Sequence, residues 1–196
     1  MAALLVLRGG ATMCSTALRA ERELRMLYAY IFERVGVLLR DMHFRNTRPA
    51  ARDEGSERGV RLELRIRERQ DWQGTEFAAQ RVVIDRPVWR ADIFVAVGSP
   101  PESFDRAHYH SRFEGTEPVR REWSDRLTAS PFEWLREELS DLAALLDRAG
   151  VADDGVRDAD AAELRRAAPE IAEKARTVFD EVHRGELVSE VNRPFV

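Results

Sequence analysis

The segment VRLELRIR, residues 60–67, alternates strictly between apolar and charged side chains. In a strand, Val60, Leu62, Leu64 and Ile66 would share one face and the charged residues the other. A strand with one apolar and one charged face belongs in a sheet that packs against the core on one side and is exposed to solvent on the other. That condition is typical of antiparallel sheets, so this segment favours one here.

Three further segments complete the predicted sheet. A run over residues 77–84 is a second strand, which Pro87 should end. Residues 88–97 are apolar on both sides apart from two charged positions and so belong in the centre of the sheet. Residues 105–113 form a fourth strand after a proline-containing loop. Together these strands predict an antiparallel β-meander of about four strands.

Helical patterns follow the strands. Ser130 and Glu133 have the spacing of a capping box around Pro131, and Gly150 suits the left-handed residue after a helix end. A second helical region covers residues 161–184, with an expected break at its internal proline. We therefore predict an α+β domain over residues 60–190, in which the meander packs against C-terminal helices.

The N-terminal region has a different pattern. Apolar residues between Ser15 and Met42 recur at steps of three and four, which predicts an amphipathic helix within an extension over residues 1–42. Residues 43–59 are polar and contain Pro and Gly, as is typical of a flexible linker. An apolar helix on a linker must bury its stripe, so we expect a protein partner or a homo-oligomer formed through it.

Charge and cysteine content limit the cellular setting. The net charge is −4, yet residues 1–70 carry 14 basic and 9 acidic side chains, against 17 and 26 in residues 71–196. This asymmetry can guide a partner, while the overall acidity disfavours nucleic acid. With Cys14 as the only cysteine, a disulfide within the chain is excluded. Because no long apolar run is present either, we expect a soluble cytoplasmic protein without membrane contact that acts by protein–protein interaction or self-association.

The stretch DRAHYHSRFEG, residues 105–115, carries the main candidates for chemistry. In a strand, His108 and His110 lie on one face with Cβ atoms roughly 6–7 Å apart. Asp92, on the preceding strand, lies opposite a histidine if paired residue numbers sum to 200 or 202, but opposite Tyr109 if they sum to 201. The sequence leaves this register open. An acid in an apolar strand also needs a charged partner, for which we expect Arg90 or Arg106.

Two functional interpretations of this face compete. In one, His108 and His110 bind a divalent metal ion together with Asp92 or Glu114, a ligand set that suits iron, zinc or manganese. In the other, the histidines act as general acid and base beside Asp92, as in ribonuclease chemistry. An arginine would then hold a phosphate, with Arg106 the first candidate and Arg90 or Arg112 as substitutes.

A third interpretation needs no function. Polar residues alternate on any solvated strand, and arginine is abundant here because only Lys174 among the 31 basic residues is a lysine. We read that bias as high-GC codon usage in a bacterial genome. The sequence alone leaves a small metal-dependent or ribonuclease-like enzyme as the alternative to an interaction protein.

The segments PVWRADIF, FDRAHYHSRFEGTEP and WLREELSDL resemble a group of small proteins from high-GC actinobacteria. The resemblance covers roughly residues 86–150. It implies a compact soluble domain of bacterial origin and brings no activity with it.

Overall fold

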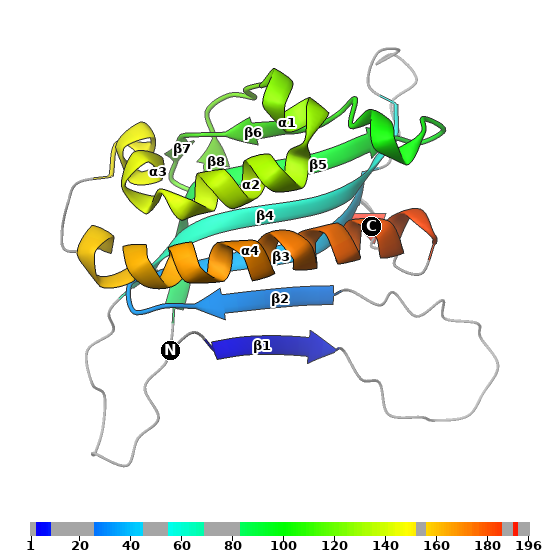
Figure 1. Cartoon of the computed structure of the whole chain (residues 1–196). Helices are drawn as coiled ribbons and strands as arrows, with labels where there is room; N and C mark the ends of the chain where they lie inside the picture. The colour runs from blue at the N-terminus through cyan, green and yellow to red at the C-terminus, as the bar shows by residue number, and fades with distance from the viewer. Residues whose placement is uncertain are drawn as a thin grey trace, which may run out of the picture.

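The computed structural model describes residues 3–8, 26–44, 55–68, 83–151, 156–185 and 190–191. A single large sheet runs through the described residues, with its strands adjacent in chain order and antiparallel (Figure 1). These strands are β1 (Ala3–Arg8), β2 (Met26–Ile31), β3 (Val35–Phe44), β4 (Glu57–Glu68), β5 (Val83–Ala96) and β6 (His108–His110). A short β9 (Glu190–Val191) pairs in parallel with β3.

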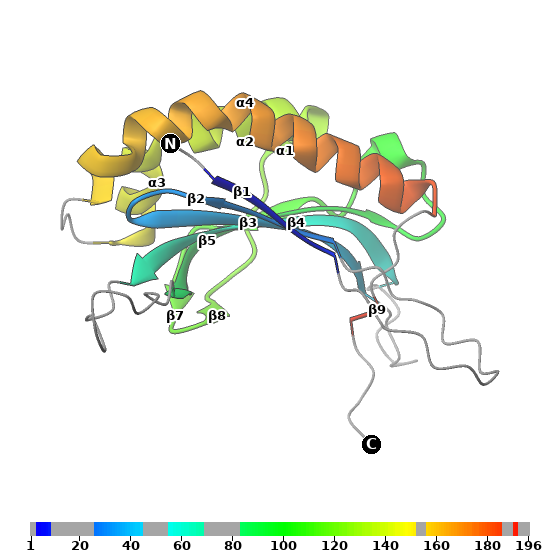
Figure 2. The same cartoon turned by 90° about the horizontal axis from the view of Figure 1, so that it is seen from below.

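The remaining elements follow β5. They are the 3₁₀ turn η1 (Pro101–Ser103), the hairpin strands β7 (Phe113–Glu114) and β8 (Glu117–Pro118), and the helices α1 (Asp125–Ala129), α2 (Pro131–Ser140), α3 (Leu142–Ala149) and α4 (Val156–His183). The helices cover one face of the sheet, and the strands bend away from them at both ends, so that the other face is concave (Figure 2). The predicted α+β class, an antiparallel sheet packed against C-terminal helices, is confirmed.

Alternate residues of β4 lie on opposite faces of the sheet, as predicted. Val60, Leu62 and Leu64 are buried beneath the helices, in a core that continues across β5 and α2. There Trp89 packs on Trp134 with ring centroids 5.8 Å apart. Arg61, Glu63 and Arg65 lie on the other, concave face, hereafter the open face.

The N-terminal helix predicted between Ser15 and Met42 is wrong from Met26 onward, where the chain forms β2 and β3; residues 15–25 lie outside the described residues. Helical spacing was a misleading signal because apolar residues occupy both faces of these strands. Tyr28, Tyr30, Val37 and Leu39 face the helices, and Leu38 and Met42 face the open side. A partner bound through that helix therefore loses its main support.

Most of the predicted linker, residues 45–54, also lies outside the described residues. Its two ends do not connect separate bodies, since His43 and Phe44 end β3 and residues from Glu57 begin β4. His43 pairs with Arg58, and Phe44 with Glu57. Residues 26–44 thus belong to the same sheet as the predicted α+β domain.

Pro87 does not end a strand. It lies inside β5, where the pairing with β4 shifts twice, so that Leu64 pairs with Trp89 but Arg65 pairs with Pro87. An irregular ladder tolerates a residue that has no N–H to donate. Of the expected strand over residues 105–113, only His108–His110 pair with β5.

The C-terminal helices differ from expectation in two ways. Ser130 makes no side-chain capping bond, and the helix breaks at Asp141, whose carboxylate accepts from the Ala144 amide and starts α3. Helix α4 is 28 residues long and continues through Pro169 without a break. Burial of its apolar stripe on the sheet outweighs the one hydrogen bond that the proline removes. Gly150 takes the predicted left-handed conformation. In the described part of the chain, no helix has the length and hydrophobicity needed to span a membrane.

The Asp160 side chain connects α4 to the turn between β2 and β3 by hydrogen bonds. Its carboxylate accepts from three backbone amides, those of Glu33 at 2.9 Å and of Arg34 and Val35 at 2.7 Å. The side chain is 1% exposed. A buried carboxylate with three such donors links the longest helix to a turn more than a hundred residues away.

We predict that Asp160→Ala lowers the free energy of unfolding by about 3 kcal/mol, because three buried amides lose their acceptor. Chemical denaturation of the two proteins measures this difference. Asp180→Asn, at an exposed position of the same helix, is the control and should change stability by less than about 0.5 kcal/mol. Equal effects of the two substitutions would contradict the proposed anchor.

Candidate functional site

Strand register places two transverse rows of residues on the open face. One row runs Arg40, Arg61, Asp92 and His108 across β3, β4, β5 and β6, and the next runs Leu38, Glu63, Arg90 and His110. The β5–β6 pairs sum to 200, so one of the two registers that bring Asp92 opposite a histidine is present. Alternation sends Tyr109 to the opposite face, where it packs against Trp134 at 5.3 Å.

Asp92 is the centre of this cluster and has no exposed surface. Arg61 holds it with two contacts, Nε to Oδ1 at 2.6 Å and Nη2 to Oδ2 at 3.1 Å. The Arg90 Nε lies 3.2 Å from Oδ2. Of the two expected partners, Arg90 is therefore present in the cluster, and Arg61 takes the place expected for Arg106.

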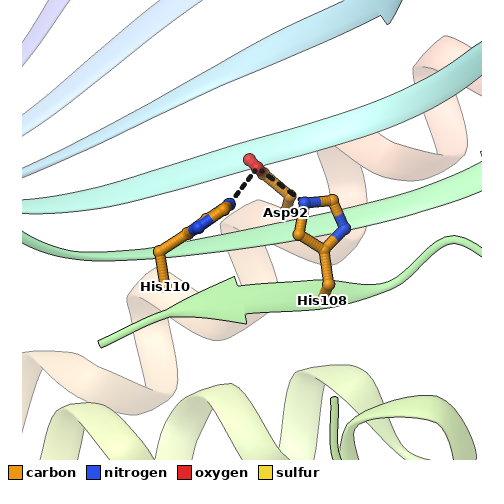
Figure 3. Close-up of side chains that lie close together, drawn as sticks. All are labelled: Asp92, His108 and His110. Carbon is orange, nitrogen blue, oxygen red and sulfur yellow. Dashed lines mark ion pairs between the residues drawn. The ribbon is translucent and has the colours of Figure 1, made fainter. Parts of the chain in front are cut away.

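Both imidazoles point their Nε2 atoms at Asp92 (Figure 3). The distances from Nε2 to Oδ2 are 3.4 Å for His108 and 3.6 Å for His110. The Nδ1 atoms are fixed by backbone carbonyls, that of Arg106 at 2.8 Å from His108 and that of Arg120 at 2.6 Å from His110. A carbonyl only accepts, so Nδ1 carries a proton in both rings, and a neutral ring then has its lone pair on Nε2.

The electrostatics of the cluster keep Asp92 charged. Burial alone would raise the pKa of this carboxyl, but the contacts with His108, His110 and Arg61 outweigh it and hold the pKa well below its usual range. Burial also lowers the pKa of the Arg90 guanidinium, against the influence of Asp92. Arg90 contacts His110 as well, with Nη2 2.9 Å from Nε2, so that imidazole nitrogen accepts from the guanidinium.

A cavity of about 280 Å³ opens beside the cluster on the same face. Its walls combine cationic, acidic and aromatic side chains. They are Phe44, Glu57, Arg61, Arg90, Asp92, Phe94, Arg106, His108 and Arg121, together with Gly55. His110 is not part of this lining; it is 3% exposed and contacts the lining residues Asp92 and Arg90. His108 thus lies in the wall of a concavity, and neither imidazole lies on a flat solvated surface.

The segment after β8 closes one side of the site. It returns antiparallel to β6, with the amides and carbonyls of Tyr109 and Glu122 bonded to each other at 2.9 and 2.8 Å. This return brings the Arg120 carbonyl to His110 and Arg121 to the cavity. It also places the Trp123 ring 6.5 Å from the His108 ring.

The structure brings together five of the predicted site residues, Arg90 among them, and leaves others apart. Asp92, His108 and His110 converge, and Arg106 lines the cavity and supplies a carbonyl to His108. Arg112 is exposed and donates to the Arg148 carbonyl, while Glu114 is exposed on the β7–β8 hairpin. The second carboxylate considered for a metal site is thus absent from the cluster.

Four cavity residues had no signal in the sequence analysis. Arg61 was one of several charged residues on an alternating strand, and Arg121 lay in a loop. Glu57 and Phe44 fell within the predicted linker. The pairing of β3, β4 and β5 brings Arg61, Glu57 and Phe44 to the cavity, and the segment that returns along β6 brings Arg121 there. Burial raises the pKa of the Glu57 carboxyl, although Arg121 and His108 act in the opposite direction.

The chain matches no protein-family model, no curated protein and no solved structure. The geometry of the site therefore carries the functional argument alone.

We predict that Asp92→Ala lowers the free energy of unfolding by about 3–5 kcal/mol, because Arg61 and Arg90 would lose their buried counter-charge. Urea denaturation measures the change. Glu114→Gln removes an exposed acid from the adjacent hairpin and should be nearly neutral. A loss at Asp92 no larger than that control would mean that the carboxylate does not organise the open face.

Proposed function

We propose that Asp92, His108 and His110 bind a divalent metal ion and that the protein is a metal-dependent hydrolase of phosphate esters. The observation that carries this proposal is the convergence of three potential ligand atoms, all within 4.8 Å of one another, from side chains that are almost completely buried. One carboxylate and two imidazoles leave coordination positions for water and substrate.

The spacing of these atoms suits an ion. Ligands about 2.1 Å from a tetrahedral ion lie roughly 3.4 Å from one another, and the two nitrogen–oxygen distances here are 3.4 and 3.6 Å. The backbone carbonyls at both Nδ1 atoms are the outer-shell partners that orient metal-binding histidines. A solvated strand face requires neither feature.

The arginines favour an anionic substrate. With neutral imidazoles, Arg61, Arg90 and Asp92 together carry a net charge of +1, which opposes entry of a cation. An anion in the adjacent cavity offsets that charge, so metal and substrate should support each other's binding. Planar guanidinium groups suit phosphate in particular, because they donate two parallel hydrogen bonds to its oxygens.

Hydrolysis requires only water as a second reactant. The oxygen of water forms a new bond to phosphorus, the ester P–O bond breaks, and the leaving oxygen takes a proton. A divalent ion lowers the pKa of bound water and polarises the phosphoryl oxygen. The guanidiniums lining the cavity would stabilise the charge that develops on the phosphate oxygens.

The first test is metal content. Protein purified without a polyhistidine tag and dialysed against zinc or manganese should retain about one ion per chain. His108→Ala/His110→Ala should retain none and should also lose hydrolysis of bis(p-nitrophenyl) phosphate. His183→Ala, which removes a histidine at the end of α4, should behave like the wild type. No retained metal in the wild type would refute the proposal.

Arg90 provides a sharper test because it contacts two of the three ligand atoms. Arg90→Met removes a positive charge about 3 Å from them and should tighten zinc binding on the order of tenfold or more in titration calorimetry. Arg65→Met removes the same charge from the open face of β4, where Arg65 pairs with Glu63, and should have a smaller effect. Unchanged or weaker zinc binding in Arg90→Met would contradict a metal at this position.

A further inference from the structure

We infer that the cavity beside the three converging side chains binds a small phosphorylated ligand with a flat ring, of the size and class of a mononucleotide. This names the substrate class of the proposed hydrolytic site and, for catalysis, rests on that proposal. Binding of the ligand itself depends only on the cavity, whose residues can be tested without metal.

The charge of the cavity selects an anion. Four guanidinium groups, from Arg61, Arg90, Arg106 and Arg121, face two carboxylates, and one of these, Asp92, is already held by Arg61. The lining therefore carries a net charge of +2 in a chain whose overall net charge is −4. This local excess against the overall charge marks the cavity as a phosphate subsite.

Trp123 supplies the reason to expect a ring. It is 67% exposed, and its ring lies 6.5 Å from that of His108. Only one residue separates it from Arg121, so the same segment brings a guanidinium to the cavity and an indole near His108, which lines the cavity. An exposed tryptophan offers a flat surface on which a base can stack, and stacking tolerates any base.

The dimensions restrict the ligand to a small molecule. A volume of about 280 Å³ is at the lower end of small-molecule sites, and Phe44 and Phe94 close one side with ring centroids 5.4 Å apart. The acidic charge of the whole chain also opposes a long polyanion. A single phosphate and one ring fit these limits better than an extended nucleic acid.

The test uses the full chain after treatment with EDTA, with adenosine 5′-monophosphate, inorganic phosphate and adenosine as probes in titration calorimetry. The nucleotide should bind at least tenfold more tightly than phosphate or adenosine alone. Trp123→Ala should weaken nucleotide binding about tenfold and leave phosphate binding unchanged. Arg121→Gln should weaken both, whereas Arg120→Gln, at an adjacent residue with a 74% exposed side chain, should weaken neither.

The outcomes separate this inference from the metal proposal. Nucleotide binding with these variant effects, in a protein that never retains metal, would support the cavity assignment and refute only the hydrolase. Metal retention without binding of either phosphate or nucleotide would overturn the present inference and leave the metal site intact. Nucleotide binding that is unaffected by Trp123→Ala and Arg121→Gln would also overturn it. Because both side chains are exposed, loss of folding should not obscure these results.

Discussion

A carboxylate with no exposed surface must find its charged and polar partners inside the protein, and Asp92 finds them on three strands. Arg61 on β4, Arg90 on β5 and the two histidines of β6 all approach it. Moving the carboxylate and the two guanidinium groups out of water costs several kcal/mol each, and the cost is offset only in the observed register. A slip by one residue would present Ala91 to the arginine and leave the acid in the core.

Because side chains alternate along each strand, one face of the sheet packs against the helices and the other carries the candidate site. Along β6, Tyr109 packs against Trp134 beneath the helices, while its neighbours His108 and His110 face the open side. The helices thus hold the sheet from one face, and no helix among the described residues covers the other (Figure 2). The bend of the strands makes that second face concave, and the segment around Glu122 closes its edge. A rigid sheet with a shielded polar hollow is a suitable frame for a site that must fix three ligand atoms.

Local patterns predicted the elements whose two faces differ in polarity. The strict alternation of residues 60–67 correctly assigned both faces of β4, and the apolar run after Pro87 correctly indicated a strand in the interior of the sheet. The same reasoning failed for β2 and β3, since apolar residues such as Leu38 and Met42 on the open face make strand and helix periodicity indistinguishable. It failed again at Pro169, where tertiary packing outweighs an unfavourable local preference.

The candidate site was predictable only in part, for a related reason. His108, His110 and Asp92 could be selected because histidine pairs and acids in apolar strands are unusual. Arg61, Arg121 and Glu57 could not, because each reaches the cavity through strand pairing or a returning loop that local sequence does not encode. Unusual residue types thus indicated the centre of the site in the sequence. The residues of its walls could be identified only from strand pairing and from the returning loop in the structure.

The central claim is that both histidines hold Nδ1 against a backbone carbonyl and direct Nε2 at one point beside Asp92. Long-range proton–nitrogen correlation spectra of ¹⁵N-labelled protein measure the protonation of each ring nitrogen directly. We predict that His108 and His110 both carry a proton on Nδ1 and that zinc shifts both Nε2 resonances together. An unprotonated Nδ1 in either ring, or zinc shifts at only one of the two Nε2 nitrogens, would contradict it.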